Sequence, residues 1–502
     1  MKFPVLRGAA GSRALAVFLC AGAFCAPALA AHSRDTAFGS GGLVFEQDSN
    51  DGPQLWVSDG SAATLLKTFT PSVDKYPPQQ FEVFKGKVYF NADDTADDGD
   101  PGIVAGADLW FTDGSGVTRF TPQVLAPVGM TNVNDTTLFF LAHTDGDAGY
   151  RLWTYDGSTA APVAGIAAGE VTPNSLSQVV FNNKLYFVAD IGGSGNAIYS
   201  LADGSSAPTP ISCPVVTGAC TTLSGAPSQL TVVGSTLYFV AYDDNDEFEI
   251  WKTDGTLGGT TEVTTTADLA PQDLAAVNGK LFFSALGDAA GSMGREPWIT
   301  DGTPGSEALL LNVSPTVGTT DLGSSPLPLA ALGTKLVFLA DDGTEGIEPW
   351  ITDGSSGGTA ILKDIRAGKN GSGITTGTVL SVGATPTLLF GATDGDRGNE
   401  LWSSDGTGAN TMMLADLHSG SASSKPERFT VSGSKAFFHA TGSDGPQLWI
   451  TDGTAPGTVL VQQFEPVKGS GHGSGGGGGG ALDGGALTGL ALLLAARRRR
   501  AR

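Results

Sequence analysis

Short apolar runs recur along the chain, each bounded by turn residues such as Gly, Asn, Asp or Ser. One kind of run carries a Phe, as in KVYFNA and KLYFVA, and follows a tight turn such as VNGK. Another apolar stretch, such as LTVV, precedes that turn. Runs this short and this rich in Val, Ile and Phe predict β-strands rather than helices. The Phe recurs in nine units, at Phe45, Phe90, Phe140, Phe187, Phe239, Phe283, Phe338, Phe390 and Phe438.

A second phrase, of the form EPWITDGT, follows each Phe run by about a dozen residues. All eight Trp of the chain lie in it, and Tyr199 holds the Trp position of a degenerate fourth unit. An Asp-Gly pair and then Ser or Thr follow in every unit. This is a hairpin-turn signal, because Gly adopts positive φ and the Asp carboxylate accepts backbone N–H bonds. The eight Trp are Trp56, Trp110, Trp153, Trp251, Trp298, Trp350, Trp402 and Trp449.

Each unit therefore predicts four short strands: an inner strand, the Phe strand, the Trp strand, and a closing strand after the Asp-Gly turn. Four strands repeated every 43 to 54 residues predict an all-β fold, a single large β-propeller of about nine four-stranded units. A β-solenoid is the competing shape, but its repeats are usually shorter. Only TAFGSGG precedes the first Phe strand, so both eight and nine blades fit the sequence.

The repeated phrase resembles the ELWxxDGT repeat of exported bacterial proteins, and ELWSSDGTG from Glu400 is the nearest match. The resemblance covers residues 36–466. Pro297 and Pro349 replace the Leu of that pattern, and Gln54 and Gln447 replace the Glu. The resemblance implies a repeat fold and export, and it assigns no particular chemistry.

The first 30 residues predict a signal peptide for Sec export. They combine basic residues, an apolar run and the small-residue pattern Ala28-Leu29-Ala30, and signal peptidase is expected to cut after Ala30 or Ala31. A retained membrane anchor is the alternative, but the apolar run is short for a span. Export also places Cys213 and Cys220 in an oxidising compartment, where a local disulfide is expected. A redox-active pair is disfavoured because the spacing is not Cys-x-x-Cys.

The C-terminal stretch has three parts: a Gly/Ser linker over residues 467–480, a short apolar run, and an Arg cluster, the last two within 481–502. The Arg cluster would hold this hydrophobic segment on the cytoplasmic side of a membrane. This order of parts resembles the GlyGly-CTERM sorting signal of Gram-negative bacteria. The resemblance implies cleavage near Gly480 by a rhombosortase-type protease and release to the cell surface or medium. Asp483 inside the tail departs from the pattern and weakens the membrane segment.

The charge balance restricts the partners. The chain has 28 basic and 51 acidic residues. The two terminal segments hold eight of the bases and one acid, so the central part keeps 20 bases and 50 acids, a net charge near −30. Such a surface repels nucleic acid and anionic membranes and attracts cations or basic proteins.

The shared residues are interpreted as structural. A Trp that recurs once per unit at one strand position is better explained as a packing anchor between blades than as a sugar-stacking surface. An Asp present in nine copies cannot act as nine catalytic acids, because catalysis needs an asymmetric constellation with tuned pKa values. The turn interpretation therefore applies to Asp301, Asp353 and Asp452 and to their counterparts.

The loops between the Phe and Trp strands are acidic, as in DDTADDGDPG from Asp93 and YDDNDEFE from Tyr242. Carboxylates in flexible Asp/Gly loops suit Ca²⁺. The candidate ligands are Asp93, Asp97, Asp243, Asp244 and Asp246. No loop matches a calcium-loop pattern in register, and a solvated acidic rim is the alternative.

These observations favour an exported, cell-surface or secreted propeller with a structural or an interaction role, binding protein or glycan, over an enzyme. A Ca²⁺-stabilised adhesin and a carboxylate-based hydrolase or lyase are the alternatives. The chain lacks G-x-S-x-G, a P-loop and H-E-x-x-H. No cofactor is expected apart from Ca²⁺ in the adhesin. An active site would lie where the units differ, in the loop from Asp93 to Asp108 or in the fourth unit.

Overall fold

The structure is a computed structural model. It describes residues 33–467, apart from 71–75, 95–106, 123, 145–148, 174–176, 194, 205, 213–226, 244–246, 288–293, 316–322 and 383–384. The chain forms two units, Met1–Pro466 and Val467–Arg502. All of the described strands belong to the first unit. In the described part of the chain, no helix has both the length and the apolar character needed to cross a membrane.

The described strands form nine four-stranded antiparallel units, here called blades 1 to 9. Seven are separate sheets, and blades 2 and 3 share one eight-stranded sheet. Two short 3-10 helices, η1 (Leu257–Gly259) and η2 (Ser356–Gly358), follow the Asp-Gly turns of blades 5 and 7. By blade, the strands are β1 (Asp35–Phe38), β2 (Gly42–Ser49), β3 (Gly52–Ser58), β4 (Ala63–Thr68); β5 (Gln79–Phe84), β6 (Lys87–Ala92), β7 (Asp108–Thr112), β8 (Val117–Arg119); β9 (Leu125–Val133), β10 (Thr137–His143), β11 (Arg151–Tyr155), β12 (Ala160–Pro162); β13 (Gln178–Phe181), β14 (Lys184–Ala189), β15 (Ala197–Leu201), β16 (Thr209–Pro210); β17 (Ser228–Val233), β18 (Thr236–Tyr242), β19 (Phe248–Thr253), β20 (Thr261–Glu262); β21 (Gln272–Val277), β22 (Lys280–Leu286), β23 (Arg295–Thr300), β24 (Ala308–Leu309); β25 (Leu327–Leu332), β26 (Lys335–Asp341), β27 (Ile347–Thr352), β28 (Ala360–Ile361); β29 (Gly377–Val382), β30 (Thr385–Ala392), β31 (Glu400–Ser404), β32 (Met412–Ala415); and β33 (Glu427–Ser432), β34 (Lys435–Gly442), β35 (Gly445–Thr451), β36 (Val459–Gln463).

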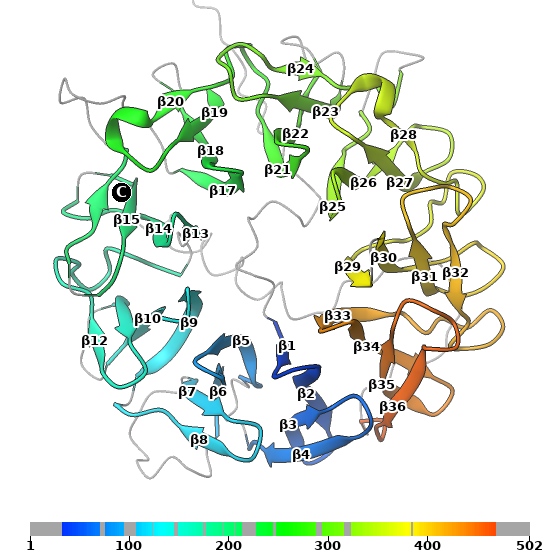
Figure 1. Cartoon of the computed structure of the whole chain (residues 1–502), viewed down its shortest axis with the longest axis horizontal. Helices are drawn as coiled ribbons and strands as arrows, with labels where there is room; N and C mark the ends of the chain where they lie inside the picture. The colour runs from blue at the N-terminus through cyan, green and yellow to red at the C-terminus, as the bar shows by residue number, and fades with distance from the viewer. Residues whose placement is uncertain are drawn as a thin grey trace, which may run out of the picture. The chain divides into compact units, whose positions relative to one another are not determined.

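Within the first unit the blades close into a ring (Figure 1). The first strand of every blade contacts the first strand of the next, and β33 of blade 9 contacts β1 of blade 1. The predicted all-β propeller is therefore confirmed, with nine blades among the described residues. The short first unit is complete, because the four residues of β1 supply its inner strand. Blades 1 and 9 exchange no strand, since each takes its four strands from one continuous segment.

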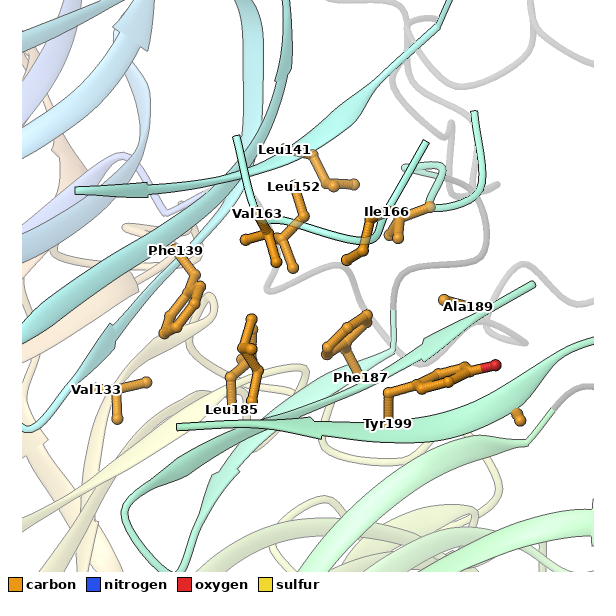
Figure 2. Close-up of a cluster of buried hydrophobic side chains, with 13 residues drawn as sticks. Val133, Phe139, Leu141, Leu152, Val163, Ile166, Leu185, Phe187, Ala189 and Tyr199 are labelled. Atoms are coloured by element: carbon orange, nitrogen blue, oxygen red, sulfur yellow. The ribbon is translucent and has the colours of Figure 1, made fainter. Parts of the chain in front are cut away.

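The core lies between the blades. In all nine blades the shared Phe pairs across the sheet with the Trp, or with Tyr199 in blade 4. This register places both rings on one face, toward the preceding blade. Figure 2 shows the case between blades 3 and 4, where Phe187 and Tyr199 belong to one buried cluster with Phe139, Leu141 and Leu152. Each interface thus buries apolar side chains from two consecutive repeats, which is the main favourable contribution to folding.

Candidate functional site

The Asp-Gly turns are held by their own side chains. In blade 7 one carboxylate oxygen of Asp353 accepts the backbone N–H of Ser355 at 2.9 Å and its hydroxyl at 2.6 Å. The N–H of Gly354 donates to the Thr352 hydroxyl at 3.0 Å. Asp301 and Asp452 each accept the backbone N–H two residues on in their own turns, from Thr303 and Thr454. The two bonds from Ser355 hold the pKa of Asp353 below its usual value, and the bond from the Ser355 hydroxyl has the larger effect.

The Gly of the same pair lies close to the preceding blade. Gly302 has φ +84°, and an added Cβ would overlap the hydroxyl of Tyr238 in blade 5. In blade 8 a Cβ on Gly406 would come within 2.9 Å of Leu332 in blade 7. The preceding blade also reaches across: Lys280 in blade 6 donates to the Gly354 carbonyl of blade 7 at 3.2 Å. The turn therefore needs Gly both for its backbone conformation and for the neighbour's approach.

The Trp positions are mostly enclosed. Trp251 is 1% exposed and Trp110 2%, and both belong to clusters that join two blades. Trp56 and Trp449 are half-buried. Trp153, Trp298, Trp350 and Trp402 are also buried in clusters between blades. At the six buried positions the described Trp side chains present no open aromatic surface for a sugar.

The Glu two residues before the Trp is a structural residue that the sequence analysis did not single out. Glu296 is fully buried and accepts the N–H groups of Val313 and Ser314, at 3.0 and 3.3 Å, and that of Ser324. These residues belong to the segment that leads from blade 6 to blade 7. Glu348 and Glu400 bind the outgoing segments of blades 7 and 8 in the same way. The signal was present in the sequence, because four units carry Glu at this position.

Burial raises the pKa of the Glu249, Glu296 and Glu348 carboxyl groups. The pKa of Glu348 rises to about 7, because burial outweighs the N–H bonds from Ile365 and Arg366. Burial also raises the pKa of Glu249 to about 7, against the hydroxyl bond from Thr264. In blades 6, 7 and 8 the carboxyl group takes the place of water as the hydrogen-bond partner of the outgoing backbone.

The seam between blades 9 and 1 holds the densest cluster of charged groups between blades in the described ring. Arg428 on β33 pairs with Asp35 on β1 and donates to the backbone carbonyls of Arg34 and Glu46 at 3.0 and 2.9 Å. The Glu46 carboxylate lies 3.3 Å from Arg34 and 3.8 Å from Arg428. Nε2 of His439 on β34 lies 3.2 Å from the Asp35 carboxylate.

Burial and pairing set the charges in this cluster. Burial raises the pKa of Asp35, but His439 and Arg428 more than offset it, so the pKa lies below its usual value. Burial lowers the pKa of His439, which favours the neutral ring. Burial raises the pKa of Glu46 to about 7, despite the nearby Arg34. The His439 and Asp35 side chains are only 8% and 4% exposed, so the pair offers little access to a substrate. The ion pairs of Arg428 with Asp35 and Glu46 join blade 9 to blade 1 at this seam.

The predicted calcium ligands are not assembled by the described part of the chain. Asp93 is buried at the end of the Phe strand of blade 2. Asp243 accepts the N–H of Glu247 at 2.9 Å, which closes the start of its own loop. Asp97, Asp244 and Asp246 lie outside the described residues. Among the residues that are described, no group of three or more His, Cys, Asp or Glu could hold a metal ion. The calcium site stays a prediction.

The sequence predicts two other regions in which an active site could lie, the loop from Asp93 to Asp108 and the fourth unit. The loop from Asp93 to Asp108 is largely outside the described residues. In the fourth unit Tyr199 pairs with Phe187 as a Trp does elsewhere, but Gly204 lacks the positive φ of the other turns. Cys213, Cys220, Ala30 and Gly480 lie outside the described residues, as does the predicted C-terminal membrane segment.

These contacts define the class of the protein: a nine-bladed β-propeller whose ring is closed by side chains and whose repeated motif fastens blade to blade. No protein-family model and no curated protein matches the chain.

Several solved structures are similar to it at low identity. The β-propeller domain of the Trilobed protease from Pyrococcus furiosus matches with 9% identity and TM-score 0.37, over 77% of this chain and 98% of that one. A prolyl endopeptidase matches with 12% identity and TM-score 0.38, over 74% and 57%. A puromycin-hydrolysing peptidase of Mycobacterium tuberculosis matches with 12% identity and TM-score 0.36, over 67% and 52%. The chain thus spans little more than half the length of these two peptidases, and the likenesses assign it no activity.

Proposed function

We propose that this protein is an exported, cell-surface or secreted propeller that binds another protein or a glycan and catalyses no reaction. The observation that carries the proposal is the use made of the repeated residues. The shared Phe and Trp pack against the preceding blade, the Asp and Gly build the turn, and the Glu holds the outgoing segment. A motif fully engaged in this way is free for neither catalysis nor ligand binding.

Two further observations support a role in binding. The acid-base pair at the seam, Asp35 and His439, is enclosed between two blades. The ends of the sequence carry the features of an export signal and of a surface-sorting signal. A rigid ring exposed outside the cell is a scaffold whose variable loops and edges can recognise a partner.

A protein and glycan array, probed with the mature exported chain, tests the proposal. We expect saturable, reproducible binding to a restricted set of ligands, with no change in the bound ligand. A seam variant, His439→Phe, is the matched test for chemistry, because it removes the only described imidazole paired to a buried carboxylate. Reproducible turnover of any substrate would overturn the proposal, and its loss in His439→Phe would locate the reaction at the seam.

A further inference from the structure

The outermost strands of the blades differ in length. In blades 4 to 7 the outer strand has two residues, and in blades 2 and 3 it has three. It has four residues in blade 8, five in blade 9 and six in blade 1. Very short edge strands prevent unwanted pairing with other chains. Three consecutive blades around the closing seam lack this protection.

A change in the Trp strand accompanies the longer edges. In blades 1, 8 and 9 the pairing of the outer strand shifts by a bulge at the Trp and then continues. Gln447 in blade 9 pairs with Gln463 across this extension, and their side chains bond at 2.7 Å. Gln54 in blade 1 bonds Thr68 in the same way at 3.3 Å. In blades 1 and 9, the two units with Gln in place of the repeat Glu, the side chain binds the outer strand.

These edges are apolar and exposed. Met412 on β32, Val459 and Leu460 on β36, and Leu65 on β4 are 42% to 50% exposed. They make up half of the large exposed hydrophobic residues in the described part of the chain. The sequence of β36 is VLVQQ and that of β32 is MMLA, so neither carries a charge. β36 is the last strand of its sheet, so its outward N–H and C=O groups form an edge to which a further strand can pair.

The charge around the edge indicates what could occupy it. Exposed acids follow the outer strands, Asp416 after β32 and Glu465 after β36, and Asp59 precedes β4. The whole chain carries 51 acidic and 28 basic residues. A second copy would bring the same acids and be repelled, whereas a basic segment would be attracted.

We propose that the outer edge of β36 binds an extended, net-basic segment of another protein as a fifth strand, with β32 and β4 flanking the site. Backbone pairing supplies the affinity, Val459 and Leu460 contact side chains on the two opposite faces of the added strand, and the flanking acids select basic ends. This inference rests on the proposed binding function and specifies the class of partner, a net-basic extended segment of a protein.

The test uses the mature chain and a labelled peptide, Lys-Val-Thr-Val-Thr-Val-Lys, in fluorescence polarisation. Two matched peptides separate the contribution of charge from that of backbone pairing. One has Glu in place of both Lys, and the other is N-methylated on alternate residues so that it cannot form hydrogen bonds along one edge. The protein variant is Val459→Lys/Leu460→Lys. Its control is Leu327→Lys, an exposed Leu on the inner strand β25. All three protein substitutions replace exposed side chains, so the variants should fold.

We expect the Lys-ended peptide to bind and the other two peptides to bind at least tenfold more weakly. The β36 double variant should bind the Lys-ended peptide with at least tenfold lower affinity than the parent. The Leu327→Lys control should bind like the parent. The proposal is overturned if the Lys-ended peptide does not bind, if N-methylation has no effect, or if the β36 variant binds unchanged. Self-association that the β36 variant removes would make a second copy the occupant and would also overturn it. Enzymatic turnover would overturn the proposed function but leave the peptide result standing.

Discussion

At the scale of single residues, the Asp-Gly pair serves two purposes at once. The Asp carboxylate closes the turn through the N–H two residues on, and the Gly accepts a positive φ. The same Gly also gives the preceding blade room to approach, as Tyr238 approaches Gly302. Any side chain at the Gly position would therefore destabilise the fold in two independent ways. It would strain the backbone at positive φ, and it would overlap the preceding blade.

The double role of Gly302 can be measured. Gly302→Ala should destabilise the protein by more than the roughly 1–2 kcal/mol that a positive φ costs a non-Gly residue, because the new Cβ meets the Tyr238 hydroxyl. Gly279→Ala is the control, since Gly279 has φ +75° and open space around its Cβ position. Urea unfolding midpoints report the difference. Equal losses in the two variants would show that packing does not matter, and Gly302→Ala/Tyr238→Phe should recover part of the loss.

The buried Glu of the repeat should make stability depend on pH. The pKa of Glu348 is about 7 in the folded chain against 4.5 for an ordinary Glu. Its stabilising contribution is therefore present below pH 4.5 and is lost as the pH rises through 7. Compared with Glu348→Gln, the parent should lose about 2 kcal/mol between pH 5 and pH 8.

Thermal unfolding of both proteins across this pH range checks the prediction. Glu465→Gln, which changes an exposed Glu after β36, should leave the pH profile unchanged. A parent and a Glu348→Gln variant with parallel profiles would contradict a raised pKa.

At the scale of the elements, the first strands of the blades carry the contacts that set one blade against the next. In some blades a residue with positive φ in the first strand directs a polar side chain to the following blade. Gln229 does this in blade 5, accepting the Leu274 N–H at 3.4 Å, and Arg428 does it in blade 9. Of these two side chains, only that of Arg428 faces buried carboxylates, those of Asp35 and Glu46. The closing seam thus uses ion pairs where another seam uses an amide.

Arg428→Met should therefore cost about 3–5 kcal/mol, because it leaves the buried Asp35 carboxylate without its Arg partner, whereas Glu46 keeps Arg34. Gln229→Met, at the equivalent position of blade 5, should cost about 1 kcal/mol, the value of one ordinary hydrogen bond. Urea unfolding at pH 7 measures both changes. If the two variants lost the same stability, the seam would be no more dependent on charge than the other interfaces.

At the scale of the whole molecule, the excess of acids opposes folding. The chain has a formal net charge of −23 and a sequence pI near 4.4. Like charges over a compact ring repel one another, and salt shortens the range of that repulsion from about 30 Å at 0.01 M to about 3 Å at 1 M.

Raising NaCl from 0.01 M to 0.5 M at pH 8 should therefore increase the melting temperature by several degrees, as measured by circular dichroism. The same scan with Arg428→Met separates repulsion from pairing, because the variant lacks the seam cation. A melting temperature that falls with salt in the parent but not in the variant would mean that the seam ion pairs outweigh the general repulsion.

Much of the blade could be predicted from the sequence because its signals are local. Turn residues, alternating apolar runs and the spacing from Phe to Trp lie within about twenty residues of one another, and they fixed the strands and the turns. The acids of the Asp-Gly turns, such as Asp353, were assigned to turns for the same reason. The Glu of the motif was missed because its partners, such as Ser324 for Glu296, lie on the segment that leads to the next blade.

The sequence by itself determined the unit: four strands, a Phe paired with a Trp, and a turn built on Asp-Gly. Only the tertiary structure decided that nine units close a ring, that Arg428 meets Asp35 across 393 residues, and that three neighbouring blades leave long edges open. The physical reason is range. Backbone propensity and turn chemistry act between near neighbours, whereas closure depends on small angles between blades that add up around the whole ring and on side chains brought together only once it has closed.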